Sequence, residues 1–223
     1  MIYLNNYGWN DKLSQLKQES TYNALTHGRI SIVHRTCYEV VSENGLFQCE
    51  LTGNMMYGKS DFELPCTGDW VLFQPFDEHK GIIVDMLPRE RTLYRKKNGT
   101  VADKQAIASY VDKAFIVQSL DDNFNVRRAE RFMVQMQEEN INPVLVFNKA
   151  DLGFDEQKVE EQIRHIARQI PVFFTSIHQP QTILQLRESI SAGETVVFVG
   201  SSGVGKSSLV NALCEKSVLL TSD

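Results

Sequence analysis

One segment, residues 200–207, constrains the fold of this chain more than any other stretch. It reads Gly-Ser-Ser-Gly-Val-Gly-Lys-Ser, with an apolar run over 195–199 before it and helix-forming residues after it. Glycines allow a tight turn in which several backbone N–H groups point into one concavity, and the start of a helix adds further donors. A glycine-rich turn without a ligand is the alternative, but this order of strand, loop and helix favours a phosphate-binding loop.

The individual positions of this phosphate loop have expected roles. We expect Lys206 to reach the β- and γ-phosphates of a nucleotide and the Ser207 hydroxyl to hold Mg²⁺, so these two are the catalytic candidates and Ser207 the metal ligand. The other predicted phosphate contacts are Gly200, Ser201, Ser202, Gly203, Val204, Gly205 and Ser208.

A second motif, Asn148-Lys149-Ala150-Asp151, follows the apolar strand expected over 144–147. The Asp151 carboxylate can accept from guanine N1–H and the 2-amino group, which adenine does not offer in that arrangement. Asn148 would bond to the base edge or to the phosphate loop, and the Lys149 stem would lie over the base. Alone the motif could be a solvated turn, but its place at a strand end favours a guanine-binding loop. Thr175 and Ser176, at the next strand end, are predicted to complete it.

Composition sets the remaining limits on the chain. Its 223 residues suit two domains, and a formal charge of −5 means that any nucleic acid must be met by a local basic patch. The four cysteines form no Cys-x-x-Cys pair and are expected to be reduced thiols. We expect a cytoplasmic protein, because neither a signal peptide nor a run of about 18 apolar residues is present.

Changes in composition and hydrophobic pattern divide the chain into four parts. Residues 1–25 form an N-terminal segment with a helix expected over 10–20, and residues 26–90 carry short β-rich runs that favour a five-stranded barrel of the oligonucleotide-binding (OB) type. Residues 91–107 resemble a basic linker. Strands alternating with helices over 108–223 predict a parallel sheet covered on both faces. The fold class is therefore α/β with an all-β N-terminal domain.

The order of the two motifs is unusual, because the guanine-binding motif precedes the phosphate loop. The chain resembles the circularly permuted, ribosome-small-subunit-dependent GTPase A family, and the resemblance runs nearly end to end. It is carried by Tyr7-Gly8-Trp9-Asn10, Gly68-Asp69-Trp70-Val71, Leu87-Pro88-Arg89, and the segments 108–112, 124–131, 148–152 and 200–213. The resemblance implies an OB barrel, a permuted GTPase domain and a zinc domain. It also implies late maturation of the small ribosomal subunit, with GTP hydrolysis coupled to release from it.

One departure from the family limits what this chain is expected to do. In the family, switch residues and zinc ligands follow the phosphate-loop helix, and these 223 residues have no positions for them. Zn²⁺ is thus implied for a C-terminal domain whose ligands this chain lacks. We expect an incomplete GTPase domain, belonging to a longer protein, that binds GDP or GTP but hydrolyses GTP poorly by itself.

The barrel allows two interpretations, an RNA-binding module or a purely structural domain, and the resemblance favours contact with ribosomal RNA. Candidate RNA contacts are Arg29, Arg35, Arg89, Arg91, Arg95, Lys96 and Lys97, with His34, Tyr57 and Lys59 beside them. A solvated linker is the alternative for the run over 89–97. Three further arginines, Arg127, Arg128 and Arg131, indicate a solvated helix face, with RNA contact as their alternative.

Three functions compete at this point. The first is a ribosome-assembly GTPase with GTP or GDP and Mg²⁺ as ligands, acting as a monomer on the small subunit and not on a membrane. The second is an ATP-using phosphate-loop enzyme, against which Asn148 and Asp151 argue. The third is an RNA-binding module that binds a nucleotide without hydrolysing it.

Overall fold

The computed structural model describes residues 1–96, 104–120, 124–154, 156–216 and 218–219, and the chain divides into two compact units. The first comprises Met1–Val111 with Ala192–Thr195, and the second Asp112–Ser191 with Val196–Asp223. Within the described part, no helix is long and apolar enough to cross a membrane.

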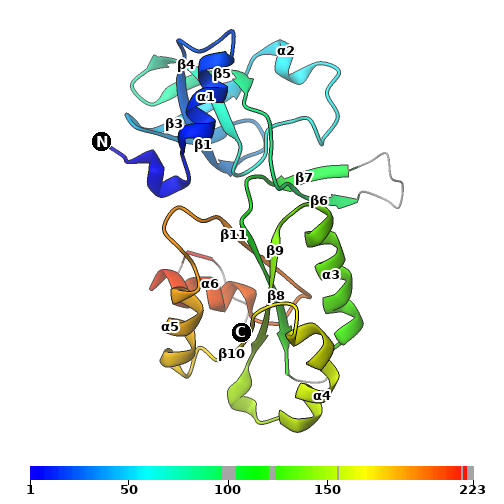
Figure 1. Ribbon diagram of the computed structural model, residues 1–223. Helices are drawn as coiled ribbons and strands as arrows, with labels where there is room; N and C mark the ends of the chain where they lie inside the picture. The colour runs from blue at the N-terminus through cyan, green and yellow to red at the C-terminus, as the bar shows by residue number, and fades with distance from the viewer. Residues whose placement is uncertain (97–103, 121–123, 155, 217, 220–223) are drawn as a thin grey trace. The chain divides into compact units, whose positions relative to one another are not determined.

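The first unit is built on a closed five-stranded barrel (Figure 1). Its strand order is β1-β2-β3-β5-β4, with β3 and β5 parallel and the other neighbours antiparallel. Side chains alternate along each strand, so Val71 and Phe73 point into the barrel core while Trp70 and Leu72 belong to an outer cluster. The strands are β1 (Thr26–Val33), β2 (Tyr38–Ser42), β3 (Gly45–Leu51), β4 (Trp70–Asp77) and β5 (Lys80–Met86).

Two helical segments precede the barrel, η1 (Leu4–Tyr7) and α1 (Asp11–Glu19). The helix begins where the sequence predicts, because the Asn10 side chain accepts a hydrogen bond from Leu13 N at 3.1 Å. Leu13 and Leu4 are buried against Trp70 in the outer cluster, which fixes this segment on the barrel.

A short helix and a two-stranded ladder of this unit have no counterpart among the predicted elements. A four-residue helix, α2 (Gly53–Met56), follows β3. Strands β6 (Leu93–Lys96) and β7 (Lys104–Ala108) pair as an antiparallel ladder inside the range expected to be a linker. Ala108 also forms a bridge to Thr67, so this ladder is tied to the loop before β4.

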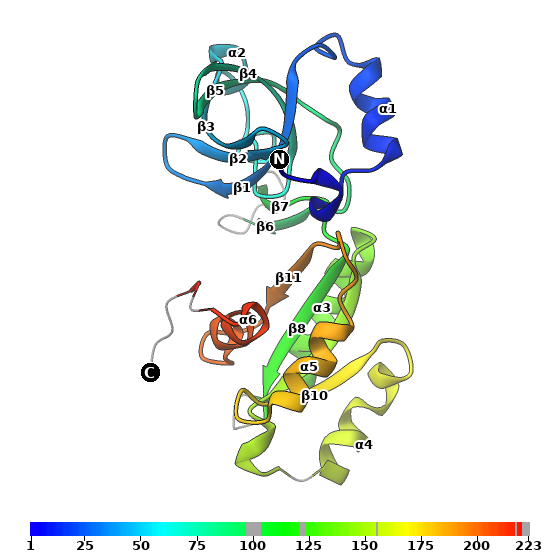
Figure 2. The same cartoon turned by 90° about the vertical axis from the view of Figure 1, so that its left-hand side faces the viewer.

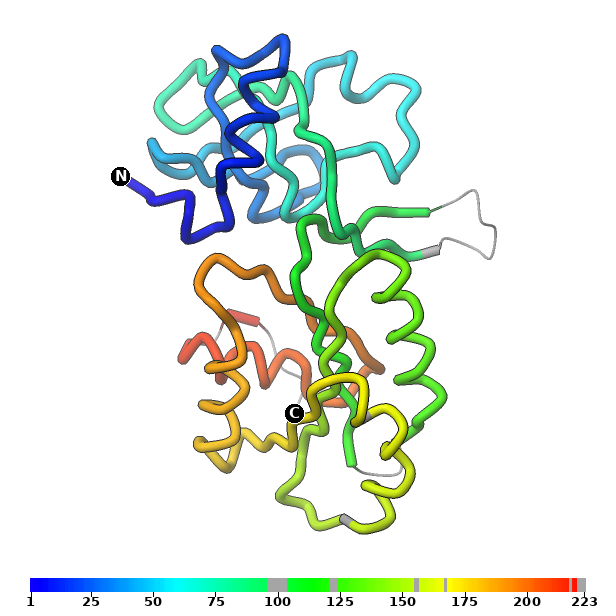
Figure 3. Tube along the Cα trace, viewed as in Figure 1, coloured from blue at the N-terminus to red at the C-terminus, as the bar shows by residue number. Residues whose placement is uncertain are grey.

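The second unit is an open parallel sheet in the order β10-β9-β8-β11. Its chain path can be followed in the tube of Figure 3. The elements are β8 (Lys113–Ser119), α3 (Val126–Glu138), β9 (Asn142–Asn148), η2 (Ala150–Leu152), α4 (Glu156–Ala167), β10 (Val172–Thr175), α5 (Pro180–Glu188), β11 (Val196–Val199) and α6 (Lys206–Cys214).

Helices cover both faces of this sheet (Figures 1 and 2). One face packs Ile116 against Met133 of α3 and Ile163 of α4. The other packs Phe115 against Leu186 of α5 and Leu209 of α6. Coverage on both faces explains why β8 is apolar over successive residues instead of alternating. The expected parallel α/β arrangement is therefore present.

Candidate functional site

The predicted motifs meet along one edge of the parallel sheet. Strand β9 ends at Asn148, β10 at Thr175, and β11 at Val199, directly before the phosphate loop. Thr175 pairs in register with Asn148, and Asn148 pairs with Ser119 of the central strand. Because parallel strands present their carboxyl ends on the same edge, residues far apart in sequence are brought together where such sheets bind ligands.

Asn148 joins the two motifs physically. Its side chain is only 3% exposed, and its Nδ2 donates to the carbonyl of Val204 in the phosphate loop at 3.0 Å. Its Oδ1 accepts from the Thr175 hydroxyl at 3.3 Å. One buried amide thus connects the ends of β9 and β10 to the phosphate loop, which fits the second of the two roles expected for Asn148.

The glycines of the phosphate loop have backbone conformations that other residues avoid. Gly205 has a φ of 89°, and a Cβ there would lie 2.2 Å from Nδ2 of Asn148. Gly203 has a φ of 79°, yet a Cβ there would meet nothing within 4 Å. Gly205 is therefore required for contact with Asn148, whereas Gly203 faces open space where a ligand could approach. Val204, between them, is 1% exposed and anchors the loop in the core.

Lys206 lies at the start of α6 and reaches back over the loop. Its ammonium donates to the carbonyls of Gly200 and Ser201, at 3.1 and 2.6 Å. Partial burial lowers the pKa of Lys206 from its ordinary value. Ser207 and Ser208 follow it in the first turn and are half-buried, while Ser202 is exposed. These positions form a cradle whose donors suit an anion.

The proposed base-binding residues occupy the loops after β9 and β10. Lys149 takes a left-handed conformation, with a φ of 62°, and is half-buried. The Ser176 hydroxyl lowers the pKa of the Asp151 carboxyl, and the nearby His178 contributes in the same direction. Ser176 itself is buried, and its backbone N–H donates to the Thr182 hydroxyl at 3.0 Å. Asp151 is thus held as an exposed carboxylate beside β10.

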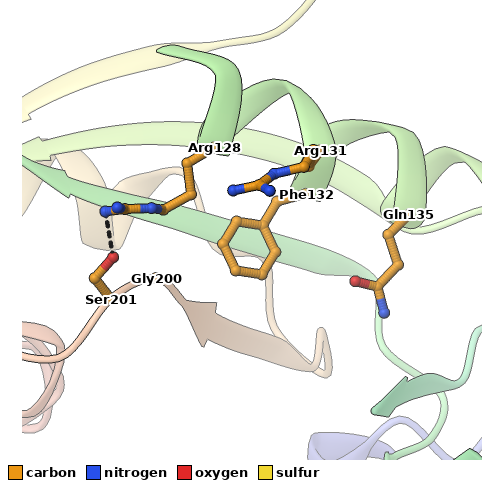
Figure 4. Close-up of a pocket in the computed structure, with 6 residues that line it drawn as sticks. All are labelled: Arg128, Arg131, Phe132, Gln135, Gly200 and Ser201. Carbon is orange, nitrogen blue, oxygen red and sulfur yellow. Dashed lines mark hydrogen bonds between the residues drawn. The ribbon is translucent and has the colours of Figure 1, made fainter. Parts of the chain in front are cut away.

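Sequence reasoning missed one contact of the phosphate loop. Arg128, on α3, donates from Nη1 to the Ser201 hydroxyl at 2.5 Å. Asn125 caps this helix by accepting from Arg128 N at 3.1 Å, and this cap is the only local signal that could have located the residue. A solvated face was the favoured interpretation for Arg128. Its side chain instead forms a hydrogen bond with Ser201 (Figure 4), a residue 73 positions away in the sequence.

The candidate RNA contacts separate into two groups. Exposed ones include Arg35, Arg95 and His34, which line a cavity of ≈ 470 Å³ between the β1–β2 turn and the β6–β7 ladder. Tyr57 is 86% exposed, and Lys59 forms an ion pair with Glu63. Lys96 lies in β6 without a described side chain, and Lys97 is outside the described residues.

Three of the predicted arginines serve the barrel instead. Arg29 is 8% exposed and donates to the carbonyls of Gly68 and Tyr7, at 2.9 and 2.5 Å. Arg89 forms an ion pair with the fully buried Asp69 at 2.6 Å. Arg91 donates to the Val111 carbonyl at 3.1 Å. These guanidinium groups are bound within the fold, so RNA contact by Arg29, Arg89 and Arg91 stays a prediction that competes with these internal contacts.

Metal-binding side chains do not cluster in the described residues. No group of three or more His, Cys, Asp or Glu side chains there could hold a metal ion. A cation at the phosphate loop would instead bind oxygen atoms, and Ser207 is the residue that fits this chemistry.

The fold and the loop geometry define a P-loop α/β protein in which the Asn-Lys-Ala-Asp segment precedes the phosphate loop. Residues 86–223 match the family described as RsgA GTPase. The chain therefore belongs to the RsgA GTPase family, which confirms the resemblance.

Curated relatives carry the same family name. Small ribosomal subunit biogenesis GTPase RsgA 1 of Bacteroides thetaiotaomicron is 75% identical over 97% of this chain and 61% of its own length. Small ribosomal subunit biogenesis GTPase RsgA of Methanosarcina acetivorans is 35% identical over 97% of this chain and 58% of its own length. The chain thus spans about three-fifths of these relatives.

Solved structures agree on the fold. The crystal structure of YjeQ from Thermotoga maritima matches with a TM-score of 0.66 and 27% identity, over 84% of this chain and 64% of that one. YloQ, described as a circularly permuted GTPase, matches with a TM-score of 0.62 and 23% identity, over 87% and 66%. The predicted fold class, an all-β barrel followed by a permuted P-loop domain, is confirmed.

Proposed function

We propose that this chain binds a guanine nucleotide with Mg²⁺ and belongs to a GTPase that acts in small-ribosomal-subunit biogenesis. The observation that carries the proposal is the Asn148–Val204 hydrogen bond, because it sets the Asp151 loop beside the phosphate cradle. A ligand with a guanine base at one end and phosphates at the other fits this arrangement. The names of the relatives support the ribosomal role.

Within this proposal each loop has one task. Backbone N–H groups of residues 200–207 and the Lys206 ammonium bind the phosphates, and the Ser207 hydroxyl holds Mg²⁺, which neutralises phosphate charge. Lys206 would exchange its two carbonyl partners for phosphate oxygens. Asp151 accepts from the guanine edge, Lys149 covers the base, and the Thr175-Ser176 loop borders it.

Base preference is the sharpest test of nucleotide binding. Xanthine replaces the guanine 2-amino donor by a carbonyl, so Asp151→Asn should restore a complementary pair with xanthine nucleotides. GDP affinity should fall by at least tenfold, and xanthosine diphosphate affinity should rise, in calorimetric titrations. The barrel variant Asp77→Asn is the control. Unchanged GDP preference in Asp151→Asn would contradict the assignment, and preference of the unaltered chain for ADP would favour an ATP-using enzyme.

Hydrolysis is supported by family membership, whereas the site geometry itself supports binding. We therefore propose that the 223-residue chain retains nucleotide but turns GTP over slowly. Phosphate release under steady-state conditions measures this directly. Rapid turnover that disappears in Lys206→Ala would refute slow hydrolysis, and absence of any GDP binding would leave only an RNA-binding module.

The barrel is proposed to contact ribosomal RNA through the cavity that Arg35 and Arg95 line. Two exposed guanidinium groups and the neighbouring Tyr38 provide phosphate contact and an aromatic surface. The variants Arg35→Glu and Arg95→Glu should weaken binding to the small subunit and reduce its salt dependence. Lys80→Glu, an exposed change on the same barrel, is the control. Equal binding by all three variants would contradict this assignment.

Three finer features complete the proposal. We place the protein in the cytoplasm, where it would act as a monomer, and light scattering of the purified chain tests its oligomeric state. The Zn²⁺ implied by the resemblance stays a prediction about the longer relatives.

A further inference from the structure

One short segment from the second half of the chain belongs to the first unit. Ala192–Thr195 lies between α5 and β11 in the sequence, yet it is part of the first compact unit together with Met1–Val111. Strand β11 begins at the next residue, Val196, and its last residue, Val199, directly precedes the phosphate loop. The phosphate loop is therefore joined to the first unit by a single strand of four residues.

Gly193 holds this segment against the N-terminal turn of the first unit. It has a φ of 79°, and a Cβ there would lie 2.9 Å from the Asn5 carbonyl oxygen. Gly8 has a φ of 90°, and a Cβ there would lie 3.0 Å from the Gly193 carbonyl oxygen. Because neither glycine carries a side chain, the two backbones meet more closely than other residue types would allow.

The turn at Gly8 is itself bound to the barrel on both of its sides. The carbonyl of the preceding residue, Tyr7, accepts a hydrogen bond from the buried Arg29 of β1 at 2.5 Å. The following residue, Trp9, packs its ring against Trp70 of β4, with the ring centroids 4.8 Å apart. Gly193 therefore rests on a support that the barrel holds in place.

The neighbouring strand, β8, also begins next to a residue that the first unit holds. Val111 is fully buried, its N–H donates to the Arg91 carbonyl at 3.1 Å, and its carbonyl accepts from Arg91 Nε at 3.1 Å. Strand β8 starts two residues later, and its Lys113 pairs in register with Val196 of β11. Because strands are extended and closely packed, a displacement at the start of β11 is passed along it to the phosphate loop.

We propose that the Gly8–Gly193 contact is a positioning contact for the phosphate loop, through which the first unit controls guanine-nucleotide affinity. The inference rests on the proposed nucleotide binding. While the contact is made, the start of β11 is fixed, and the loop keeps the conformation in which its N–H groups converge. When the contact is broken, the start of β11 shifts and the loop shifts with it. Such coupling is reciprocal, so a bound nucleotide stabilises the turn at Gly8 in return.

The test uses the full 223-residue chain and calorimetric titration with GDP. Gly193→Ala places a Cβ 2.9 Å from the Asn5 oxygen, so the segment must move. We expect GDP affinity to fall by roughly fivefold or more, as is typical of coupled sites. Gly58→Ala is the matched control, because Gly58 has a φ of 73° in the same unit but a Cβ there would meet nothing within 4 Å. Gly8→Ala strains the contact from its other side and should behave as Gly193→Ala does.

A second measurement needs no substitution. Amide hydrogen exchange over residues 4–9 of the unaltered chain should slow when GDP is present, although the nucleotide loops belong to the second unit. A contact that served stability alone would give no such protection by GDP. Gly193→Ala should reduce the protection, whereas Gly58→Ala should retain it.

The outcomes separate this inference from the proposed nucleotide binding. Equal GDP affinity in Gly193→Ala and Gly58→Ala overturns the positioning contact, and so does unchanged exchange over residues 4–9 when GDP binds the unaltered chain. In both cases nucleotide binding itself still stands. Failure of the unaltered chain to bind GDP overturns the proposed nucleotide binding and this inference with it.

Discussion

The Asn148 side chain donates to the Val204 carbonyl at 3.0 Å, although 56 residues separate them in the sequence. Both residues are buried, so water cannot easily replace this hydrogen bond. The bond fixes the spacing between the Asp151 loop and the phosphate loop, which under the proposed nucleotide binding must match the length of a nucleotide. A buried hydrogen bond of this kind therefore contributes to binding geometry as well as to stability.

Replacing Asn148 by Ala should weaken GDP binding by at least tenfold. The change leaves the Val204 carbonyl and the Thr175 hydroxyl without this partner, at a cost of about 1–3 kcal/mol. Calorimetry with GDP and urea unfolding measure the two effects separately. Thr175→Val is the comparison, because it removes the weaker 3.3 Å bond to Asn148, and a 3.4 Å bond to the Phe147 carbonyl, while the Asn148–Val204 bond stays. A smaller loss in Asn148→Ala than in Thr175→Val would contradict the bridging role.

Two glycines of the same loop should respond differently to Ala. Gly205→Ala places a Cβ 2.2 Å from Nδ2 of Asn148, so the loop must move and GDP affinity should fall by more than tenfold. Gly203→Ala meets no atom within 4 Å, so only the left-handed φ costs energy, about 1 kcal/mol of stability. Thermal unfolding and GDP titration of both variants test this. Equal behaviour would show that steric contact with Asn148 is unimportant.

Nucleotide affinity should depend on pH through Asp151. The Ser176 hydroxyl holds the pKa of this carboxyl below its ordinary value of about 4. The Asp151 carboxylate is therefore fully ionised above the ordinary pKa, and it becomes protonated as pH falls through the lowered pKa of the folded protein. Any stability or nucleotide affinity that depends on the carboxylate is lost over the same pH range. Ser176→Ala should move the loss of GDP binding to higher pH. Circular dichroism at each pH controls for acid unfolding, and an unchanged profile would exclude this coupling.

The Asp69–Arg89 pair should be a large contributor to barrel stability. Asp69 is fully buried, and its carboxylate accepts from Arg89 at 2.6 Å and from Cys66 N at 2.7 Å. Asp69→Ala leaves a largely buried guanidinium unpaired, which costs about 3–5 kcal/mol. Asp77→Ala removes only an exposed 3.9 Å pair with Lys80, worth about 0–1 kcal/mol. Urea unfolding of both variants compares them, and similar midpoints would contradict the assignment.

Much of the fold could be predicted because its elements carry local signals. Alternating strands and helices were expected over 108–223, and α3, for example, forms over Val126–Glu138 with Met133 and Met136 buried. The β6–β7 ladder was not expected, because its basic residues resemble a solvated segment and its bridge to Thr67 is long-range. Helix α2 has four residues, too few to show a helical period.

The site was predictable to the extent that its chemistry lies within contiguous motifs. The phosphate loop and Asn148 could be proposed from sequence because of their residue types and their places after strands. The internal contacts of Arg29 and Arg89 were not predicted, because nothing local reveals that Gly68 and Asp69 will bind their guanidinium groups. The contact of Arg128 was missed for the same reason, since its partner Ser201 lies 73 residues away in the sequence.

Pairing of β11 with β8 also has a consequence for how the domain forms. The strands β8, β9 and β10 follow one another along the chain and can associate as synthesis proceeds. Strand β11 instead pairs with β8, and β9 and β10 lie between these two strands in the sequence. Contacts of high sequence separation form late, because a long loop must first be closed. We therefore expect the Asp151 loop to form before the phosphate loop during translation, and the domain to bind a nucleotide only after β11 has paired with β8.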